Sequence, residues 1–274
     1  MPFTETLSYW LRDFWLHHAD QRIASYWFVR NGMLPSVIIV SAYLVLTMVL
    51  LPKYMASREP MRLRLTMLCY NISMCIANMY FAMWAFVLYR FGQEWFNFVA
   101  PSQYDTSPQQ MQTIQFMYIY MISKYIDLLD TFFLVLRKKS LTFLHLYHHA
   151  IVPIISIISF ILHPTSNPVG IFAFFNSIVH SLIYVYLTLA TLAPATAKQV
   201  WWKKCITQAE IVQFFIYSVF TALYYTFSQG YSTAYIWIAI SQNPIFAYLF
   251  IRYYIQSYPS KCKQNVLMID KRKN

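Results

Sequence analysis

The most constraining feature of this chain is a set of long segments that carry no charge. Gly32–Pro52, Leu65–Tyr89 and the longer run Ser140–Ala197 contain no Asp, Glu, Lys or Arg. A helix that crosses the roughly 30 Å hydrocarbon core of a bilayer needs about 20 apolar residues, and each segment is long enough. Only 11% of all residues are charged, whereas soluble domains carry roughly a quarter. These observations exclude an ordinary soluble domain and predict a membrane protein.

Two polar breaks divide the longest apolar segments into helical hairpins. The break in Ser140–Ala197 comprises His163, Pro164, Asn167, Pro168 and Gly170, and the break in Cys205–Ile251 is Ser228–Thr233. A further candidate span, Thr113–Leu136, contains three charges. We therefore predict an all-α polytopic membrane protein with seven transmembrane helices in a single membrane domain. Residues 1–31 form its N-terminal segment, residues 32–256 the bundle and residues 257–274 a basic tail.

The basic residues predict the orientation of these spans, because cytosolic loops are enriched in Lys and Arg. Of the 21 basic residues, 16 fall in the tail and in alternate loops. They are Lys53, Arg58, Arg62, Arg64, Arg137, Lys138, Lys139, Lys198, Lys203, Lys204, Arg252, Lys261, Lys263, Lys271, Arg272 and Lys273. We expect a lumenal N-terminus and a cytosolic C-terminus. The net charge of +11 then reports topology, and we expect no nucleic acid partner.

Four predicted helices each carry one polar stripe inside the membrane. An ionisable group at this depth costs roughly 2.5 to 3.5 kcal/mol on insertion scales, so it needs a reason to be there. The stripes are Lys124, Asp127, Asp130 and Thr131; His145, His148 and His149; Asn176, His180 and Tyr184; and Thr207, Glu210 and Gln213. Helical rise places most of these residues roughly 8 to 18 Å from the cytosolic end of their spans. The shared depth predicts a chamber with a polar reaction zone and an apolar far end.

Histidine clusters in membranes indicate two kinds of chemistry. Membrane desaturases and hydroxylases bind two irons through eight or more imidazoles, but only His145, His148, His149 and His180 fall in the predicted chamber. We therefore predict no metal, with a metal-dependent lipid oxidase as an alternative. The other chemistry is acyl transfer, in which an imidazole nitrogen attacks a thioester and a second imidazole moves the proton. A seven-helix transporter or receptor is a third possibility, and it needs a polar pathway open to both faces or a lumenal ligand site.

The four stripes resemble the sequence boxes of the very-long-chain fatty acid elongases, the ELO or ELOVL family. The HxxHH box is His145, His148 and His149, and the KxxExxDT box appears as Lys124, Asp127, Asp130 and Thr131. The NxxxHxxMY box appears as Asn176, His180, Ile183 and Tyr184, and TxxQxxQ as Thr207, Glu210 and Gln213. Asp127, Ile183 and Glu210 depart from the family residues Glu, Met and Gln, but no histidine is changed.

The resemblance implies condensation of a long-chain acyl-CoA with malonyl-CoA to a 3-oxoacyl-CoA through an acyl-histidine, without a bound cofactor. It implies six helices around a substrate tunnel and a seventh outside. His148 is then the nucleophile and His180 its partner, supported by His145 and His149. Substrate-binding residues are Lys124, Asp127, Asp130, Asn176, Tyr184, Thr207 and Gln213, while Lys138, Lys139 and Lys204 either meet the CoA phosphates or serve only as topology signals.

The resemblance and the C-terminal sequence also imply a location in the cell. The last residues, Lys271, Arg272, Lys273 and Asn274, are similar to the dibasic retrieval signals of endoplasmic reticulum membrane proteins. We therefore expect a multi-pass protein of that membrane. The lipid bilayer and the reductases and dehydratase of the elongation cycle are its expected partners, and a homodimer is compatible with the family.

Overall fold

A computed structural model describes residues 3–193 and 200–258, and almost all of these residues lie in helices or short connections. One isolated β-bridge joins Val99 to Gln229. The helices are α1 (Phe3–Ser8), α2 (Phe14–His18), α3 (Trp27–Arg30), α4 (Leu34–Val45), α5 (Leu51–Met55), α6 (Arg64–Leu88), α7 (Pro108–Ile126), α8 (Leu129–Leu136), α9 (Phe143–Leu162), α10 (Asn167–Leu192), α12 (Val200–Phe227) and α13 (Thr233–Ser257). The expected all-α class is confirmed.

Six helical stretches in the described part of the chain are long and apolar enough to cross a membrane. They are Leu34–Met55, which joins α4 to α5 through a π-helical turn, and α6, α9, α10, α12 and α13. This confirms a polytopic membrane protein. The expected span Thr113–Leu136 is not among them: it corresponds to α7 and α8, which are separated at Asp127 and Leu128. Seven spans and their orientation therefore stay predictions.

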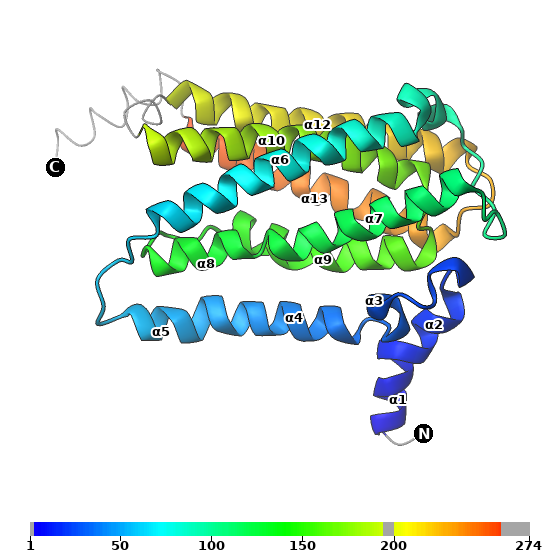
Figure 1. The fold of residues 1–274 in the computed structure, drawn as a ribbon, viewed down its shortest axis with the longest axis horizontal. Coiled ribbons are helices and arrows are strands. Elements are labelled where there is room, and N and C mark those ends of the chain that lie inside the picture. Colours follow the sequence, from blue (N-terminus) through cyan, green and yellow to red (C-terminus); the bar gives the residue numbers. More distant parts are fainter. Residues whose placement is uncertain (1–2, 194–199, 259–274) are drawn as a thin grey trace.

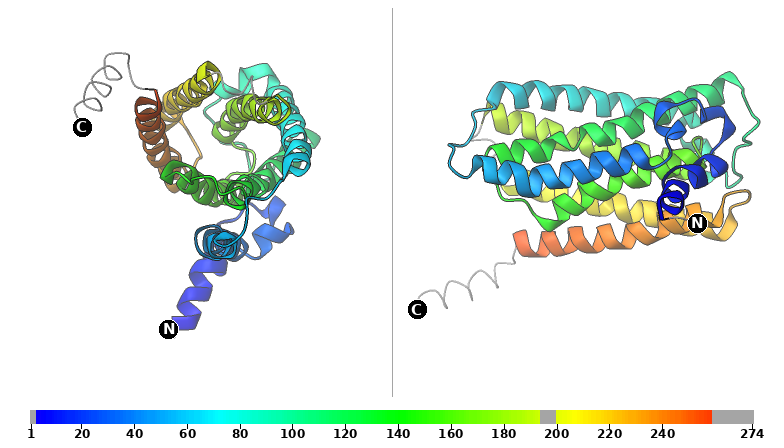
Figure 2. Two further views of the ribbon diagram at one scale, coloured as in Figure 1. Left: turned by 90° about the vertical axis from the view of Figure 1, so that its left-hand side faces the viewer. Right: turned by 90° about the horizontal axis from the view of Figure 1, so that it is seen from below.

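Six helical rods form a closed ring, and one rod lies outside it. Around the ring, the neighbouring pairs in contact are α6 with α10, α10 with α12, α12 with α13, α13 with α9, α9 with α7, and α7 with α6. The rod α4–α5 packs against α9 and α8 from outside, as the view along the bundle shows (Figure 2). Consecutive rods run in opposite directions, so α4 begins and α13 ends at opposite ends of the bundle (Figure 1).

The turn between α9 and α10 is shorter than the sequence indicated. α9 ends at Leu162 and α10 already begins at Asn167, so Pro168 and Gly170 lie in the first turns of a helix. Proline is tolerated there because the first helical N–H groups have no partner within the helix. Gly170 is required by packing, since a Cβ atom at this position would overlap the ring of Tyr89. The second break is where the sequence placed it, because α12 ends at Phe227 and α13 begins at Thr233.

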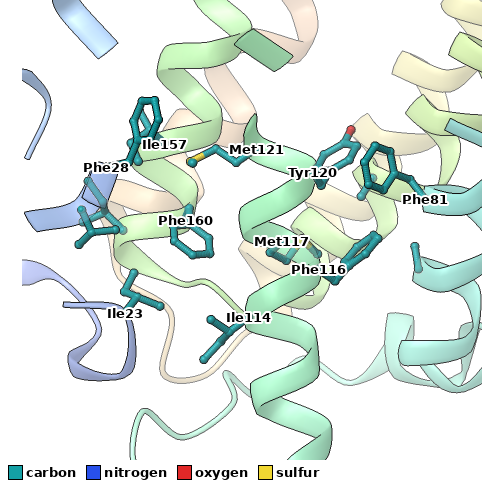
Figure 3. Packing of buried hydrophobic residues seen from close by; sticks show 14 of the residues in the cluster. Ile23, Phe28, Phe81, Ile114, Phe116, Met117, Tyr120, Met121, Ile157 and Phe160 are labelled. Atoms are coloured by element: carbon teal, nitrogen blue, oxygen red, sulfur yellow. The ribbon is translucent and has the colours of Figure 1, made fainter. Parts of the chain in front are cut away.

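A cluster of buried apolar side chains joins the N-terminal segment to α6, α7 and α9. Ile23 and Phe28 belong to the same cluster as Ile114 of α7 and Ile157 of α9 (Figure 3). Lipid tails are as apolar as these side chains, so close packing rather than transfer from water must stabilise the parts of such contacts that lie within the bilayer. The cluster occupies one end of the ring and leaves the other end to the polar residues.

Candidate active site

Lys124 and Asp127 form a buried ion pair where α7 ends. Lys124 Nζ lies 3.1 Å from Asp127 Oδ2, and the two side chains are 2% and 6% exposed. The pairing follows from sequence, because residues three apart lie on one face of a helix. Asp127 is the C-cap of α7, so the helix breaks beside the charges.

Two further groups compensate the charge of Lys124. Its Nζ donates a hydrogen bond of 3.1 Å to Asn176 Oδ1 on α10. The same amide oxygen accepts one of 2.9 Å from the hydroxyl of Tyr120. Nζ also lies 4.7 Å from the centre of the Tyr120 ring, close enough for a cation–π interaction. Lys124 is therefore held by α7 and α10 together.

Tyr184 connects the two carboxylates of α7 and α8 to α10. Its hydroxyl lies 2.9 Å from Asp130 Oδ2 and 3.3 Å from Asp127 Oδ1. The hydroxyl of Tyr70, on α6, is 3.4 Å from that of Tyr184. On the other side of Asp127, Oδ2 lies 4.0 Å from Nδ1 of His180. This nitrogen is buried and has no hydrogen-bond partner among the described residues.

The three histidines of α9 come from the first turns of that helix. Thr142 caps it, with its hydroxyl accepting from the backbone N–H of His145 at 3.2 Å. The rings of His145 and His149 pack together with centres 4.2 Å apart. The ring of His148 lies 6.4 Å from that of His180, with an angle of 28° between their planes. Two imidazoles from different helices therefore face each other beside the Lys124–Asp127 pair.

A hydrogen-bonded chain reaches these histidines from outside the ring. Nε2 of His145 is 2.8 Å from the hydroxyl of Thr131, which is 2.9 Å from the hydroxyl of Tyr43 on α4. Tyr43 and Thr131 are buried. Tyr43 was not among the predicted site residues, because it is a single tyrosine in an uncharged span. Tyr120 was not predicted either, although its four-residue spacing from Lys124 places both side chains on one face.

A cavity lies inside the ring, from Val152, one helical turn beyond His148 on α9, to His163 just past the end of that helix. None of the four clustered histidines lines it. Near the histidines it is bounded by Phe246, whose ring centre lies 5.4 Å from that of His148. Farther along, Ile155, Ser159 and Ile238 are among its walls. The cavity thus lies next to the polar cluster, in mostly apolar surroundings.

Residues in and next to the connections between helices line the far end of the cavity. His163 and Pro164 line it there, and so does Tyr235 at the start of α13. Nε2 of His163 accepts a hydrogen bond of 3.2 Å from the backbone N–H of Ser232. Burial lowers the pKa of His163 to about 4, so the ring is neutral near pH 7 and its nitrogen can accept. This contact ties the α9–α10 turn to the α12–α13 turn.

Within the described part of the chain, several candidate residues make no hydrogen bond or ion pair with the histidine cluster. The hydroxyl of Thr207 bonds the carbonyl of Lys203 in its own helix, and Nε2 of Gln213 is buried without a partner among the described residues. Lys138 donates to the carbonyl of Ala56, and Lys204 lies 5.9 Å from the ring centre of Tyr254. Lys139 is exposed. Lys198 and the tail with Lys261, Lys263, Lys271, Arg272 and Lys273 lie outside the described residues.

The described histidines, cysteines and carboxylates form no group of three arranged to hold a metal ion. The histidines pair instead with Thr131, with one another and with Asp127. This arrangement gives no support to the metal-dependent alternative.

Comparison with known proteins identifies a family over most of the chain. The profile of the ELO (GNS1/SUR4) family matches residues 28–266. The chain is 32% identical over 265 residues to very long chain fatty acid elongase 7 of Rattus norvegicus, covering 94% of this chain and 93% of that protein. It is 31% identical over 252 residues to very long chain fatty acid elongase 5 of Tachysurus fulvidraco, covering 91% and 83%. Identity to very long chain fatty acid elongase 1 of Homo sapiens is 32% over 224 residues, covering 78% and 76%.

Proposed function

Because the chain belongs to the ELO (GNS1/SUR4) family, we propose that it is a fatty acid elongase that condenses a long-chain acyl-CoA with malonyl-CoA. The products are CoA, CO2 and a 3-oxoacyl-CoA two carbons longer. The observation that carries this proposal is the position of His148 and His180. They face each other beside a buried ion pair, and the ring of Phe246 connects His148 to a mostly apolar cavity. Such a cavity suits an acyl chain, and the imidazoles suit acyl transfer.

In the first half-reaction, a ring nitrogen of His148 attacks the thioester carbon of the acyl-CoA. A carbon–nitrogen bond forms, the carbon–sulfur bond breaks, and the proton lost from His148 passes to the leaving CoA sulfur. His180 is the group that moves this proton, because it faces His148 and its Nδ1 lies 4.0 Å from a carboxylate oxygen of Asp127. A carboxylate beside Nδ1 orients the ring and stabilises its protonated form.

In the second half-reaction, malonyl-CoA loses CO2 and its α-carbon attacks the acyl-imidazole. A carbon–carbon bond forms to the acyl carbon, the carbon–nitrogen bond to His148 breaks, and the ring nitrogen regains a proton from solvent through His180. Burial of the acyl-histidine within the ring protects it from water. His145 and His149 support the site because their rings pack together and His145 is hydrogen-bonded to Thr131.

The remaining polar groups are proposed to position the histidines and the substrates. Lys124, Asp127, Asp130, Asn176 and Tyr184 form one network across α7, α8 and α10. Thr207 and Gln213 of α12 are substrate-binding residues in this proposal, and Gln213 has a free buried amide with which to bind a ligand. Lys138, Lys139 and Lys204 are proposed to bind the CoA phosphates. No bound cofactor is required, since both substrates bring their own activated groups.

We also propose seven transmembrane spans, with the N-terminus lumenal and the C-terminus cytosolic. Consecutive rods run in opposite directions, and the basic residues are concentrated in alternate loops; both observations support this topology. The endoplasmic reticulum is the proposed membrane, on the basis of membership of the ELO (GNS1/SUR4) family. The reductases and dehydratase of the elongation cycle are proposed partners, and a homodimer is a proposed assembly.

The direct test uses purified full-length protein in lipid nanodiscs. Incubation with a long-chain acyl-CoA and isotopically labelled malonyl-CoA is expected to yield labelled 3-oxoacyl-CoA, detected by mass spectrometry. Labelled CO2 from carboxyl-labelled malonyl-CoA should appear in equal amount. Folded protein that makes neither product with any acyl-CoA in a chain-length series would contradict the proposal.

Tyr43→Phe is expected to slow condensation several-fold. The change removes the hydroxyl that holds Thr131 against His145, and a lost buried hydrogen bond of this kind costs about 1 kcal/mol. Steady-state assays should show a lower kcat with little change in the KM for acyl-CoA, because the cavity is untouched. Tyr80→Phe is the matched control, since Tyr80 is exposed. Equal kcat values for the two variants would show that the hydrogen bonds from Tyr43 through Thr131 do not orient His145.

Ser159→Trp is expected to shorten the longest acyl chain that the protein elongates. Ser159 lines the cavity 11 residues beyond His148 on the same helix, roughly 16 Å along its axis. An indole at this position fills the far part of the cavity and leaves the near part free. Product profiles across a panel of acyl-CoA lengths should lose the longest members only. Val219→Trp, on an exposed position of α12, should leave the profile unchanged, and an unchanged profile for Ser159→Trp would place the acyl chain elsewhere.

A further inference from the structure

The first helical residues form an arm that leaves the bundle at a steep angle. We call Phe3–His18 the N-terminal arm; it comprises α1, a π-helical turn and α2. The rods of the bundle run side by side, whereas α1 points across them and away from the ring, on the side of α4 (Figures 1 and 2). The arm is located at the end of the bundle where α4 begins.

The backbone of the arm is held closely against the start of α4. The backbone N–H of Met33 donates a hydrogen bond of 2.7 Å to the carbonyl of Leu11. Gly32 adopts a φ of +60°, and a Cβ atom there would lie 2.5 Å from the Leu11 oxygen and 2.6 Å from Cα of Arg12. Glycine is needed both for this φ and for this approach. The contact fixes the direction in which the arm leaves the first span.

The free part of the arm exposes large apolar side chains. Leu7 is 47% exposed, Tyr9 43% and Trp10 56%. Leu7 and Trp10 are three residues apart and share one face of the helix, and the Trp10 ring lies 5.2 Å from that of Phe14. Glu5, Ser8 and Arg12 are exposed polar residues interleaved with them. The arm therefore has an apolar side that nothing in the described structure covers.

We propose that the N-terminal arm lies in the membrane interface and inserts Leu7 and Trp10 among the lipids around α4. The start of α4 beside the arm exposes Leu34, Val37 and Ile38, on a helix that is long and apolar enough to span a membrane. The arm extends from that helix across the direction of the spans, so it runs along the plane of the bilayer surface. Its apolar side thereby continues the lipid-facing surface of α4.

The side-chain chemistry of the arm fits the headgroup region. Tryptophan and tyrosine are enriched at membrane–water interfaces because they combine an apolar ring with a polar tip. A short amphipathic helix binds there through its buried apolar area. A second copy of the chain is less suited as the occupant, because Glu5, Arg12 and Asp13 interrupt the exposed surface with charges of both signs. The inference rests on the spans and does not depend on the elongase activity.

Nitroxide scanning of the full-length protein tests this placement. In a background with Cys69, Cys75, Cys205 and Cys262 replaced by alanine, Leu7→Cys and Trp10→Cys are each spin-labelled in nanodiscs that hold one chain. Electron paramagnetic resonance then compares collisions with oxygen, which concentrates in lipid, and with a water-soluble nickel complex. We expect the oxygen-to-nickel ratio at both positions to be several-fold above that of Tyr104→Cys, an exposed site in the α6–α7 connection.

Two further labels make the result decisive. Ile38→Cys, on the exposed surface of α4, provides the value for lipid, and Arg12→Cys should be closer to the value of Tyr104→Cys. Ratios at Leu7 and Trp10 equal to that of Tyr104→Cys would overturn the proposal. Spin–spin broadening in proteoliposomes that disappears on dilution with unlabelled protein would also overturn it, since it would assign this surface to a second copy.

Discussion

Replacing His148 by alanine is expected to abolish 3-oxoacyl-CoA formation, with a loss of at least about a thousandfold. The reason is geometric: His148 is the imidazole that lies both against the cavity wall at Phe246 and opposite His180. No other described nucleophile shares both contacts. The measurement is the rate of labelled product in nanodiscs, with thermal stability recorded to confirm that the variant is folded.

The acyl-enzyme provides an independent readout of the same prediction. With acyl-CoA alone, the wild-type protein should gain the mass of one acyl group on the peptide that contains His148, and His148→Ala should not. His180→Ala should slow both acylation and condensation by roughly a hundredfold or more, the usual contribution of acid–base catalysis. His17→Ala, at an exposed position in the arm, is the matched control and should retain full activity. Acylation of His148→Ala at the wild-type rate would refute the role of this residue.

Lys124→Met is expected to destabilise the bundle by about 3 to 5 kcal/mol, the usual effect of removing one partner of a buried ion pair. The ammonium group compensates Asp127 at 3.1 Å and also satisfies Asn176. Without it, the carboxylate is left in a site that is almost closed to water. For a chain of this size the apparent melting temperature in detergent should fall by roughly 10 °C.

Two variants separate this effect from a general intolerance of substitution. Lys124→Met combined with Asp127→Asn removes both charges, so it should recover part of the lost melting temperature. Arg90→Met breaks an ion pair of similar length, 3.4 Å, in which the arginine side chain is 61% exposed. An exposed ion pair contributes less than about 1 kcal/mol to stability, so Arg90→Met should barely change the melting temperature. Equal shifts for Lys124→Met and Arg90→Met would show that burial of the pair is not what stabilises it.

The candidate site was largely predictable from sequence because its residues recur at helical spacing. Lys124 and Asp127 are three apart, and Asn176, His180 and Tyr184 are four apart, so each set shares a face whatever the tertiary structure. The sequence did not predict which helix faces contact each other in the folded bundle. Asn176 contacts Lys124 across 52 residues of sequence, and Tyr43 contacts Thr131 across 88. Such pairs depend on how the helices are arranged around the ring.

The expected break at Pro168 and Gly170 shows how a local signal can mislead. Both residues are typical of turns, yet both lie inside α10. Proline is accepted in the first helical turn, and Gly170 is there because the ring of Tyr89 occupies the space of a side chain. The neighbour that requires glycine comes from another helix, which local sequence does not reveal.

The sequence alone was sufficient to predict that this protein spans a membrane and that each polar stripe shares one helical face. Both follow from the physics of a single segment, namely its length, its charge and the period of the helix. Other features appear only in the folded structure: α4 lies outside the ring, His148 faces His180, and His163, Pro164 and Tyr235 line one cavity. These contacts join residues from separate helices, and their energies depend on side-chain packing that exists only once the helices have assembled.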